Sequence, residues 1–145
     1  MANPLVVQGT LNRILASVVW QNFPALNVTA PFLNREAIRL ALDGETTRFL
    51  PTLTGAVTSP EPYMMTTITI NLLKSQNLAS LYKAQMELQS VLGDCVVRPD
   101  VTTLTPYDFV NCAIQSVREQ AYSGEDAGFA VTIRGYYLIN SSLYN

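Results

Sequence analysis

One helical pattern in a chain that otherwise alternates like β-structure constrains this fold more than any other feature. From Met65 to Leu72 apolar and polar side chains alternate with period two, as in a half-buried strand. Over residues 75–92 apolar side chains recur every three or four positions, which predicts one amphipathic helix. Ser75 is its expected N-cap, and Gly93 is the glycine expected to end it. The helix is expected to cover a sheet face with Leu78, Leu81, Tyr82 and Leu88.

Most of the remaining chain has the period-two pattern of strands. Asp43-Gly44 is a hairpin-turn signal, so we expect residues 37–42 and 45–50 to pair with each other. A strand over residues 11–20 is apolar on both faces, which predicts cover on both sides and a core position for Trp20. Further strands are expected after the helix and over residues 108–118 and 129–139.

The connections predict one domain with extended arms and a long loop. The 145 residues suffice for a single domain with a real core. Arms are expected over residues 1–10 and 140–145, and a long hairpin loop over residues 45–63. Prolines and a glycine favour a loop, and its apolar groups favour an ordered contact loop over a disordered excursion. Those apolar groups are Phe49, Leu50, Leu53, Val57 and Tyr63.

These elements together predict a mainly β (α+β) fold. Because tight turns dominate, the strands are expected to be antiparallel. The expected architecture is a β-sandwich or partly open barrel with one flanking helix and a long hairpin loop.

The composition favours self-association. Hydrophobic residues make up 48% of the chain and charged residues 14%, and the mean hydropathy is +0.17. No apolar run is long enough to span a bilayer, so no membrane anchor is expected. The chain is more apolar than a soluble monomer usually is. An oligomer whose copies cover one another's apolar surface explains this excess of hydrophobic residues better than a monomer with few charges and a well-buried core.

Charge and cysteine content exclude other classes of protein. The net charge is −2 and the pI about 5.0, which argues against nucleic-acid binding by phosphate neutralisation. Cys95 and Cys112 fall in predicted strands and are expected to be reduced and buried. The N-terminus lacks a signal-peptide pattern, so synthesis in the cytoplasm is expected.

The residue types do not suggest catalysis. The chain has no histidine, which removes the usual proton shuttle and the common zinc sites. Its glycines form no phosphate-binding loop, and the adjacent acids Glu125 and Asp126 are expected to be solvated. We therefore expect a protein that is not an enzyme and has no cofactor or metal.

Two groups of small, neutral side chains are regularly spaced along the polar faces of predicted strands. They are an ordinary solvent-facing sheet surface or the lining of a channel that a negatively charged molecule passes without sticking. The two groups are Thr67, Thr69 and Asn71, and Asn111, Ala113 and Gln115.

The C-terminal half resembles the tail tube proteins of contractile-tailed bacteriophages. The resemblance covers roughly Thr66 to Leu143 and rests on the order of its pieces, while the N-terminal half matches in layout. The pieces are the strand before "LLKSQ…YKAQ", that helix, "GDCVVRPD", "TPYDF…NCAIQ" and "GFAVTIRGYY".

The resemblance implies a structural virion protein. Six copies would form a ring, and rings would stack into a tube that conducts DNA without binding it specifically. The loop at 45–63 and the two arms would contact neighbouring rings. The implied partners are other copies, tail sheath, tape measure and baseplate proteins, and the implied location is the virion tail.

Other functions stay open at this point. A tail terminator or baseplate ring of the same fold is one alternative, although the long loop favours a tube. A small-ligand-binding β-barrel is a more distant alternative, which predicts a monomer with an apolar cavity.

Overall fold

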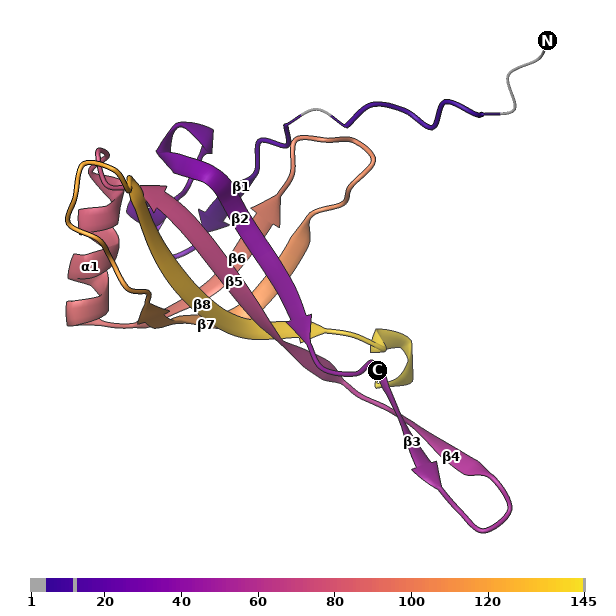
Figure 1. Cartoon of the computed structure of the whole chain (residues 1–145). Helices are drawn as coiled ribbons and strands as arrows, with labels where there is room; N and C mark the ends of the chain where they lie inside the picture. Colours follow the sequence, from indigo (N-terminus) through magenta and orange to yellow (C-terminus); the bar gives the residue numbers. More distant parts are fainter. Residues whose placement is uncertain (1–4, 12, 145) are drawn as a thin grey trace.

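The computed structural model describes residues 5–11 and 13–144. Their elements alternate between strands, short 3-10 helices (η) and one α-helix (Figure 1). In chain order they are β1 (Ser17–Trp20), η1 (Pro24–Leu26), η2 (Ala30–Phe32), β2 (Leu33–Asp43), β3 (Thr47–Pro51), β4 (Ala56–Pro60), β5 (Tyr63–Leu73), α1 (Leu78–Leu88), β6 (Val91–Arg98), β7 (Tyr107–Val117), β8 (Gly128–Leu138) and η3 (Ser141–Leu143).

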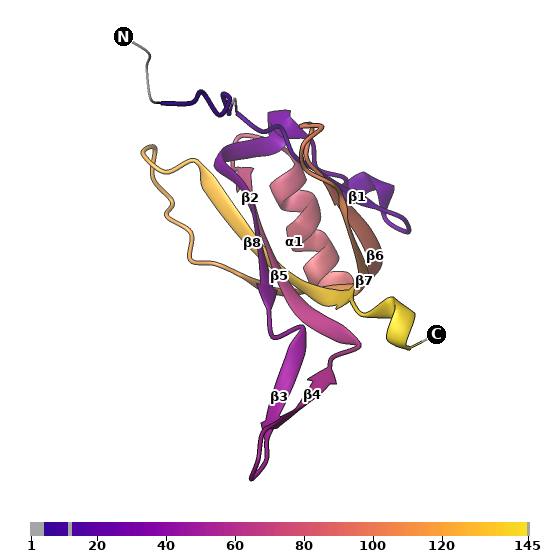
Figure 2. The same ribbon diagram turned by 90° about the vertical axis from the view of Figure 1, so that its right-hand side faces the viewer.

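Six strands form one antiparallel sheet in the order β1-β6-β7-β8-β5-β2. The sheet curls into a half-barrel and packs against α1, as the two perpendicular views show (Figures 1 and 2). β3 and β4 form a separate two-stranded hairpin. The predicted mainly β, antiparallel fold with one flanking helix and a long hairpin is confirmed.

The core lies between the curled sheet and α1. Every strand of the large sheet contributes apolar side chains to it, and α1 contributes Leu78 and Tyr82. Trp20 is buried, as predicted, and its Nε1–H donates to the Tyr82 hydroxyl at 3.0 Å. That hydroxyl in turn donates to the Leu26 carbonyl at 2.7 Å. One phenol thus joins α1, β1 and η1 inside the core.

The helix is shorter than predicted. Asn77 is the N-cap in place of Ser75, and it makes no side-chain capping bond. Gly93 does not end the helix but lies in β6, with φ +86° at a register shift. The prediction that Leu81 and Leu88 face the core is wrong, since both are exposed and Leu88 retains 84% of its surface. Three residues of α1 are buried, Leu78, Ala79 and Tyr82, so the apolar stripe turned inward is narrow.

The N-terminal strand and the first hairpin also differ from the predictions. β1 has four residues instead of the ten expected, and Leu11 and Leu15 before it are exposed. Val18 and Trp20 are buried but Val19 between them is exposed, so only one face of β1 is covered and the predicted two-sided cover is wrong. Asp43-Gly44 is not a two-residue hairpin turn, because β2 pairs with β5 and β3 pairs with β4.

A bulge in β7 changes which residues face the core. Strict alternation predicted that Val110, Cys112 and Ile114 share one face. Asn111 has φ +54° within a register shift, and this extra residue brings Phe109 onto the buried side with Cys112 and Ile114. In β8, which shows no register shift against β5, the predicted alternation is confirmed, with Val131 and Ile133 buried.

The two cysteines are buried free thiols, as predicted, with their Sγ atoms 3.7 Å apart. The hydrogen bond with Cys112, together with burial, raises the pKa of the Cys95 thiol. No helix in the described part of the chain is long and apolar enough to cross a membrane.

Both predicted arms are described in part. Residues 1–4 and 145 lie outside the described residues, and residues 5–10 have no regular structure and are exposed. The C-terminal segment forms η3 and contacts the base of the β3–β4 hairpin.

Candidate assembly surface

The β3–β4 hairpin projects beyond the sheet at the end where β2 leads into β3 (Figure 1). Its apolar side chains are in solvent, with Leu53 at the tip fully exposed and Phe49 67% exposed. Leu50 and Val57, which are partners across the hairpin, are exposed as well. A two-stranded hairpin has no hydrophobic core of its own, so these apolar side chains are not buried within the molecule. Exposed apolar groups of this kind are typical of a surface that contacts another molecule.

The hairpin is fixed at its base by the C-terminal segment. The Asn140 amide donates to the carbonyls of Thr46 and Glu61, at 3.0 and 2.8 Å, and so joins the two legs. Asn140 has φ +52°, a left-handed conformation that asparagine tolerates better than most residues. The Tyr144 hydroxyl donates to the Pro60 carbonyl, and Ile139 N–H donates to the Pro62 carbonyl. These contacts set the angle at which the hairpin leaves the body.

The tip is also ordered. Thr52 N–H donates to the Gly55 carbonyl at 2.8 Å, and Gly55 N–H donates to the Thr52 hydroxyl at 3.1 Å. The predicted loop is therefore a hairpin, with strands where a proline-rich loop was expected. Tyr63 lies outside it, at the start of β5, where its half-exposed ring stands 5.3 Å from the ring of Tyr136.

Register places two of the predicted residues, Thr67 and Ala113, in one row across the sheet. Thr67 is opposite Ala41 on one side and Arg134 on the other, and Arg134 is opposite Ala113. These side chains alternate with the buried Ile68 and Ile133 along β5 and β8. The row therefore lies on the outer face of the half-barrel, away from the core.

Thr69 and Asn71 are less open than the pattern predicted, with 5% and 8% of their surface exposed. Ala37 has φ +53° within the register shift of β2, and its carbonyl accepts from the Asn71 amide at 3.0 Å. Asn71 thus satisfies a backbone group at an irregular position, a role that period-two spacing does not signal.

The outer face carries charged side chains beside the small neutral ones. Arg134 lies 3.8 Å from Asp43, which also accepts a hydrogen bond from the Thr67 hydroxyl. Arg39 lies 3.9 Å from Glu36. These charged side chains belong to β2 and β8, the neighbours of β5, so the sequence of β5 alone did not predict them. Because they are paired, they offset one another locally.

The second predicted polar group is split by the bulge in β7. Ala113 joins the outer row, whereas Asn111 N–H donates to the Asp94 carboxylate of β6 at 3.1 Å. Gln115 is exposed beside a second register shift. The structure therefore does not arrange Asn111, Ala113 and Gln115 as one regular stripe.

Sequence reasoning missed the open edge of the sheet. β2 is a terminal strand of eleven residues, and its outer side has no strand neighbour in the described part of the chain. Long edges of this kind bind other strands unless they are covered. Edge position depends on which strands pair over long range, and no local pattern reports it.

Neither the protein-family models nor the curated protein sequences include a match to this chain. The assembly surface described above therefore rests on its own geometry. Within the described residues, no group of three or more His, Cys, Asp and Glu side chains could hold a metal ion.

Proposed function

We propose that this chain is a structural protein whose copies form closed rings that stack into a tube, as in the phage tail tubes that its sequence resembles. The observation that carries the proposal is the β3–β4 hairpin, which is hydrogen-bonded at its base and presents Phe49, Leu50, Leu53 and Val57 to solvent. A group of exposed apolar side chains on a braced projection is suited to insertion into another copy. A capping ring has less use for such a connector, so the hairpin favours the tube over a terminator.

The half-barrel supports ring formation. A sheet that is open along β2 can continue into the sheet of a neighbouring copy, and closing the ring removes the exposed edges. The contact is heterologous, since one edge meets a different edge, and such contacts close into rings when the rotation allows it.

In this arrangement the outer face of β2, β5 and β8 lines the bore. Two of its arginines, Arg39 and Arg134, lie 3.9 and 3.8 Å from carboxylates that offset part of their charge. Arg118 lines a hollow together with Arg39 and has no ion pair with a described residue. DNA would pass such a wall without specific binding. The exposed Leu81 and Leu88 of α1 would then face outward, toward a sheath.

The interior does not favour the ligand-binding alternative. The space between sheet and helix is filled by buried side chains such as Trp20, Phe109 and Ile133. A binding barrel keeps an apolar cavity at this place.

Electron microscopy and sedimentation of the purified protein test the proposal. Wild-type protein is expected to give hollow rings and stacked tubes. Leu53→Ser is expected to stop stacking without unfolding, because a fully exposed side chain contributes within about 0.5 kcal/mol to stability. Leu88→Ser is the matched control, since Leu88 is equally apolar and exposed but lies on α1, and it should stack normally. A compact wild-type monomer at high concentration would overturn the proposal.

A further inference from the structure

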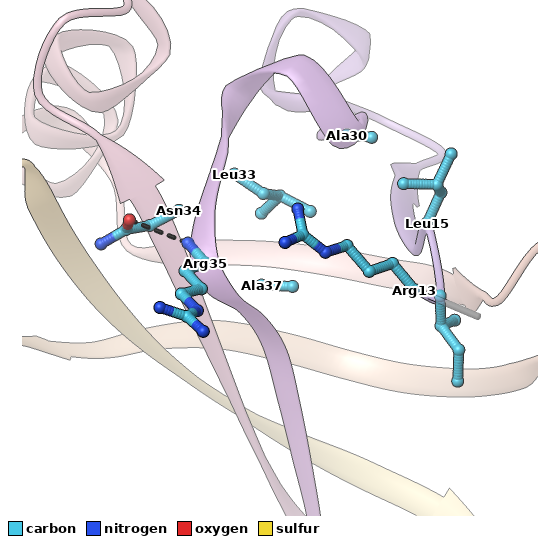
Figure 3. A pocket seen from close by; sticks show the side chains of 8 residues that line it. Arg13, Leu15, Ala30, Leu33, Asn34, Arg35 and Ala37 are labelled. Atoms are coloured by element: carbon cyan, nitrogen blue, oxygen red, sulfur yellow. Dashed lines mark hydrogen bonds between the residues drawn. The ribbon is translucent and has the colours of Figure 1, made fainter. Parts of the chain in front are cut away.

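Two arginines line a cleft of about 730 Å³ between β2 and the segment before β1. Arg13 extends from that segment toward β2, and Arg35 comes from β2 itself (Figure 3). Neither guanidinium has a hydrogen bond or ion pair with another described residue. Two unpaired cations at one cleft make a site for carboxylates or another anion.

An apolar groove continues this cleft along β2. It has a volume of about 330 Å³ and shares Ile14 with the cleft. Ile38 and Leu40 of β2 form one wall, and Val97 and Leu104 contribute to the rest. We call the cleft and the groove together the seam. It lies between β2 on one side and, on the other, the segment before β1 and the connection from β6 to β7.

The base of the hairpin carries the opposite charge. Glu45 and Glu61 belong to the two legs of the hairpin and line one hollow beside it. Neither carboxylate has a hydrogen bond or ion pair with a described side chain, unlike Asp43 nearby, which binds Arg134. β2 begins at the seam and ends at the hairpin, so the basic and acidic sites lie at opposite ends of the molecule (Figure 1).

The number of residues between the charged and the apolar side chains is the same in the seam and in the hairpin. From Arg35 to Leu40 along β2 is five residues, and from Glu45 to Leu50 along the hairpin is also five. A fully extended span of five residues is about 17 Å, and the irregularity at Ala37 makes the span from Arg35 to Leu40 somewhat shorter. A hairpin that enters the seam tip first would set its carboxylates against the arginines while its apolar residues reach the apolar groove.

We propose that the seam is the docking site for the β3–β4 hairpin of a second copy, with Glu45 and Glu61 bound by Arg13 and Arg35. This inference rests on the proposed stacking of rings and names the surface that receives the connector. The hairpin and the seam are different surfaces, and each copy has both. The contact can therefore repeat from copy to copy along the tube. The arginine–carboxylate pairs fix the register, and the apolar residues supply the burial.

A charge exchange tests the docking site. Arg13→Glu/Arg35→Glu makes seam and hairpin both acidic, and Glu45→Lys/Glu61→Lys makes both basic. Each variant alone is expected to need about tenfold or more protein to assemble, which corresponds to about 1.4 kcal/mol per contact. Mixing the two separately purified variants should restore tubes, because each hairpin then finds an oppositely charged seam.

The controls separate this inference from the proposed function. Arg118→Glu reverses an exposed cation with no ion pair that lies outside the seam, and it should stack like wild type, whereas Arg35→Glu alone should not. If Arg13→Glu/Arg35→Glu stacks normally, or the mixture assembles no better than its components, the docking site is wrong while the tube stands. If wild-type protein forms no tubes, the proposed function itself fails. Circular dichroism verifies folding, and the milder Arg13→Gln/Arg35→Gln serves if the reversal unfolds the protein.

Discussion

At the scale of single residues, the Tyr82 hydroxyl is the central polar group of the core. It accepts from Trp20 and donates to the Leu26 carbonyl, so it satisfies two other buried groups. Burial raises its pKa above the ordinary value of 10.0. The neutral phenol is therefore the form that the folded state requires.

We predict that Tyr82→Phe lowers the free energy of unfolding by about 2–4 kcal/mol at pH 7, because two buried partners lose their hydrogen bond. The unfolded tyrosine ionises near pH 10 while the folded one stays neutral. Its stabilisation is thus complete below pH 10 and is lost as the pH rises above it. Urea unfolding at pH 7 and at pH 10.5 should show the gap between wild type and variant narrowing. An equal gap at both values would contradict this assignment.

Sequence reasoning assigned several core residues of regular elements correctly, but it failed for the two exposed leucines of α1 and near residues with positive φ. Trp20, Leu78 and Tyr82 were assigned correctly because their neighbours keep a steady period. Asn111 and Ala37 each add an irregular residue to a strand, and this shifts the face of everything beyond. Such bulges depend on the partner strand, so a single sequence carries little signal for them.

At the scale of secondary-structure elements, the packing of β7 on β8 depends on Gly135. A Cβ at this position would lie 2.4 Å from the Cys112 sulfur, far inside van der Waals contact. The Gly135 carbonyl also accepts from the buried Thr66 hydroxyl at 3.1 Å. The glycine thus lets three strands approach closely beneath the core.

We predict that Gly135→Ala destabilises the fold by about 1–3 kcal/mol through overpacking. Cys112→Ala removes the clashing sulfur, so the double variant should lose less than the sum of the two single losses. Chemical denaturation of the four proteins measures this interaction energy. If the losses of the two single variants simply add in the double variant, the methyl group added at position 135 does not clash with the Cys112 sulfur, and this explanation is wrong.

Element boundaries were predictable where alternation was long and uninterrupted. The expected strands at 108–118 and 129–139 differ by one residue at each end from β7 and β8. The hairpin assignment failed because Asp43-Gly44 carries a strong local turn signal, while β2 pairs with β5 across the intervening hairpin. Long-range pairing here outweighs local turn chemistry.

At the scale of the whole molecule, the body and the hairpin are separate structural units. β3 and β4 pair with each other and with no strand of the large sheet. Sequence patterns predicted the class of fold and a partly open barrel, but not the order of its strands, which strand forms its open edge, or the seam. Those features follow from pairings distant in sequence.

We predict that replacing residues 47–60 by a short Gly-Ser linker leaves the body folded, with an unfolding midpoint within a few degrees of wild type. The core contains no residue from this range, so no core contact is lost. Differential scanning calorimetry measures the midpoint. Sedimentation should show single rings without stacks, and a collapse of the midpoint would mean that the hairpin belongs to the folding unit.

The brace at the hairpin base has a consequence for the timing of synthesis. Four hydrogen bonds that fix the hairpin come from residues 139–144. A ribosome makes these residues after the hairpin and after all eight strands. A nascent chain therefore carries a connector whose direction is not yet set, and that direction is fixed only once residues 139–144 have emerged. If copies join through the hairpin as proposed, incomplete chains would be poor partners, because the direction of their hairpin is set last.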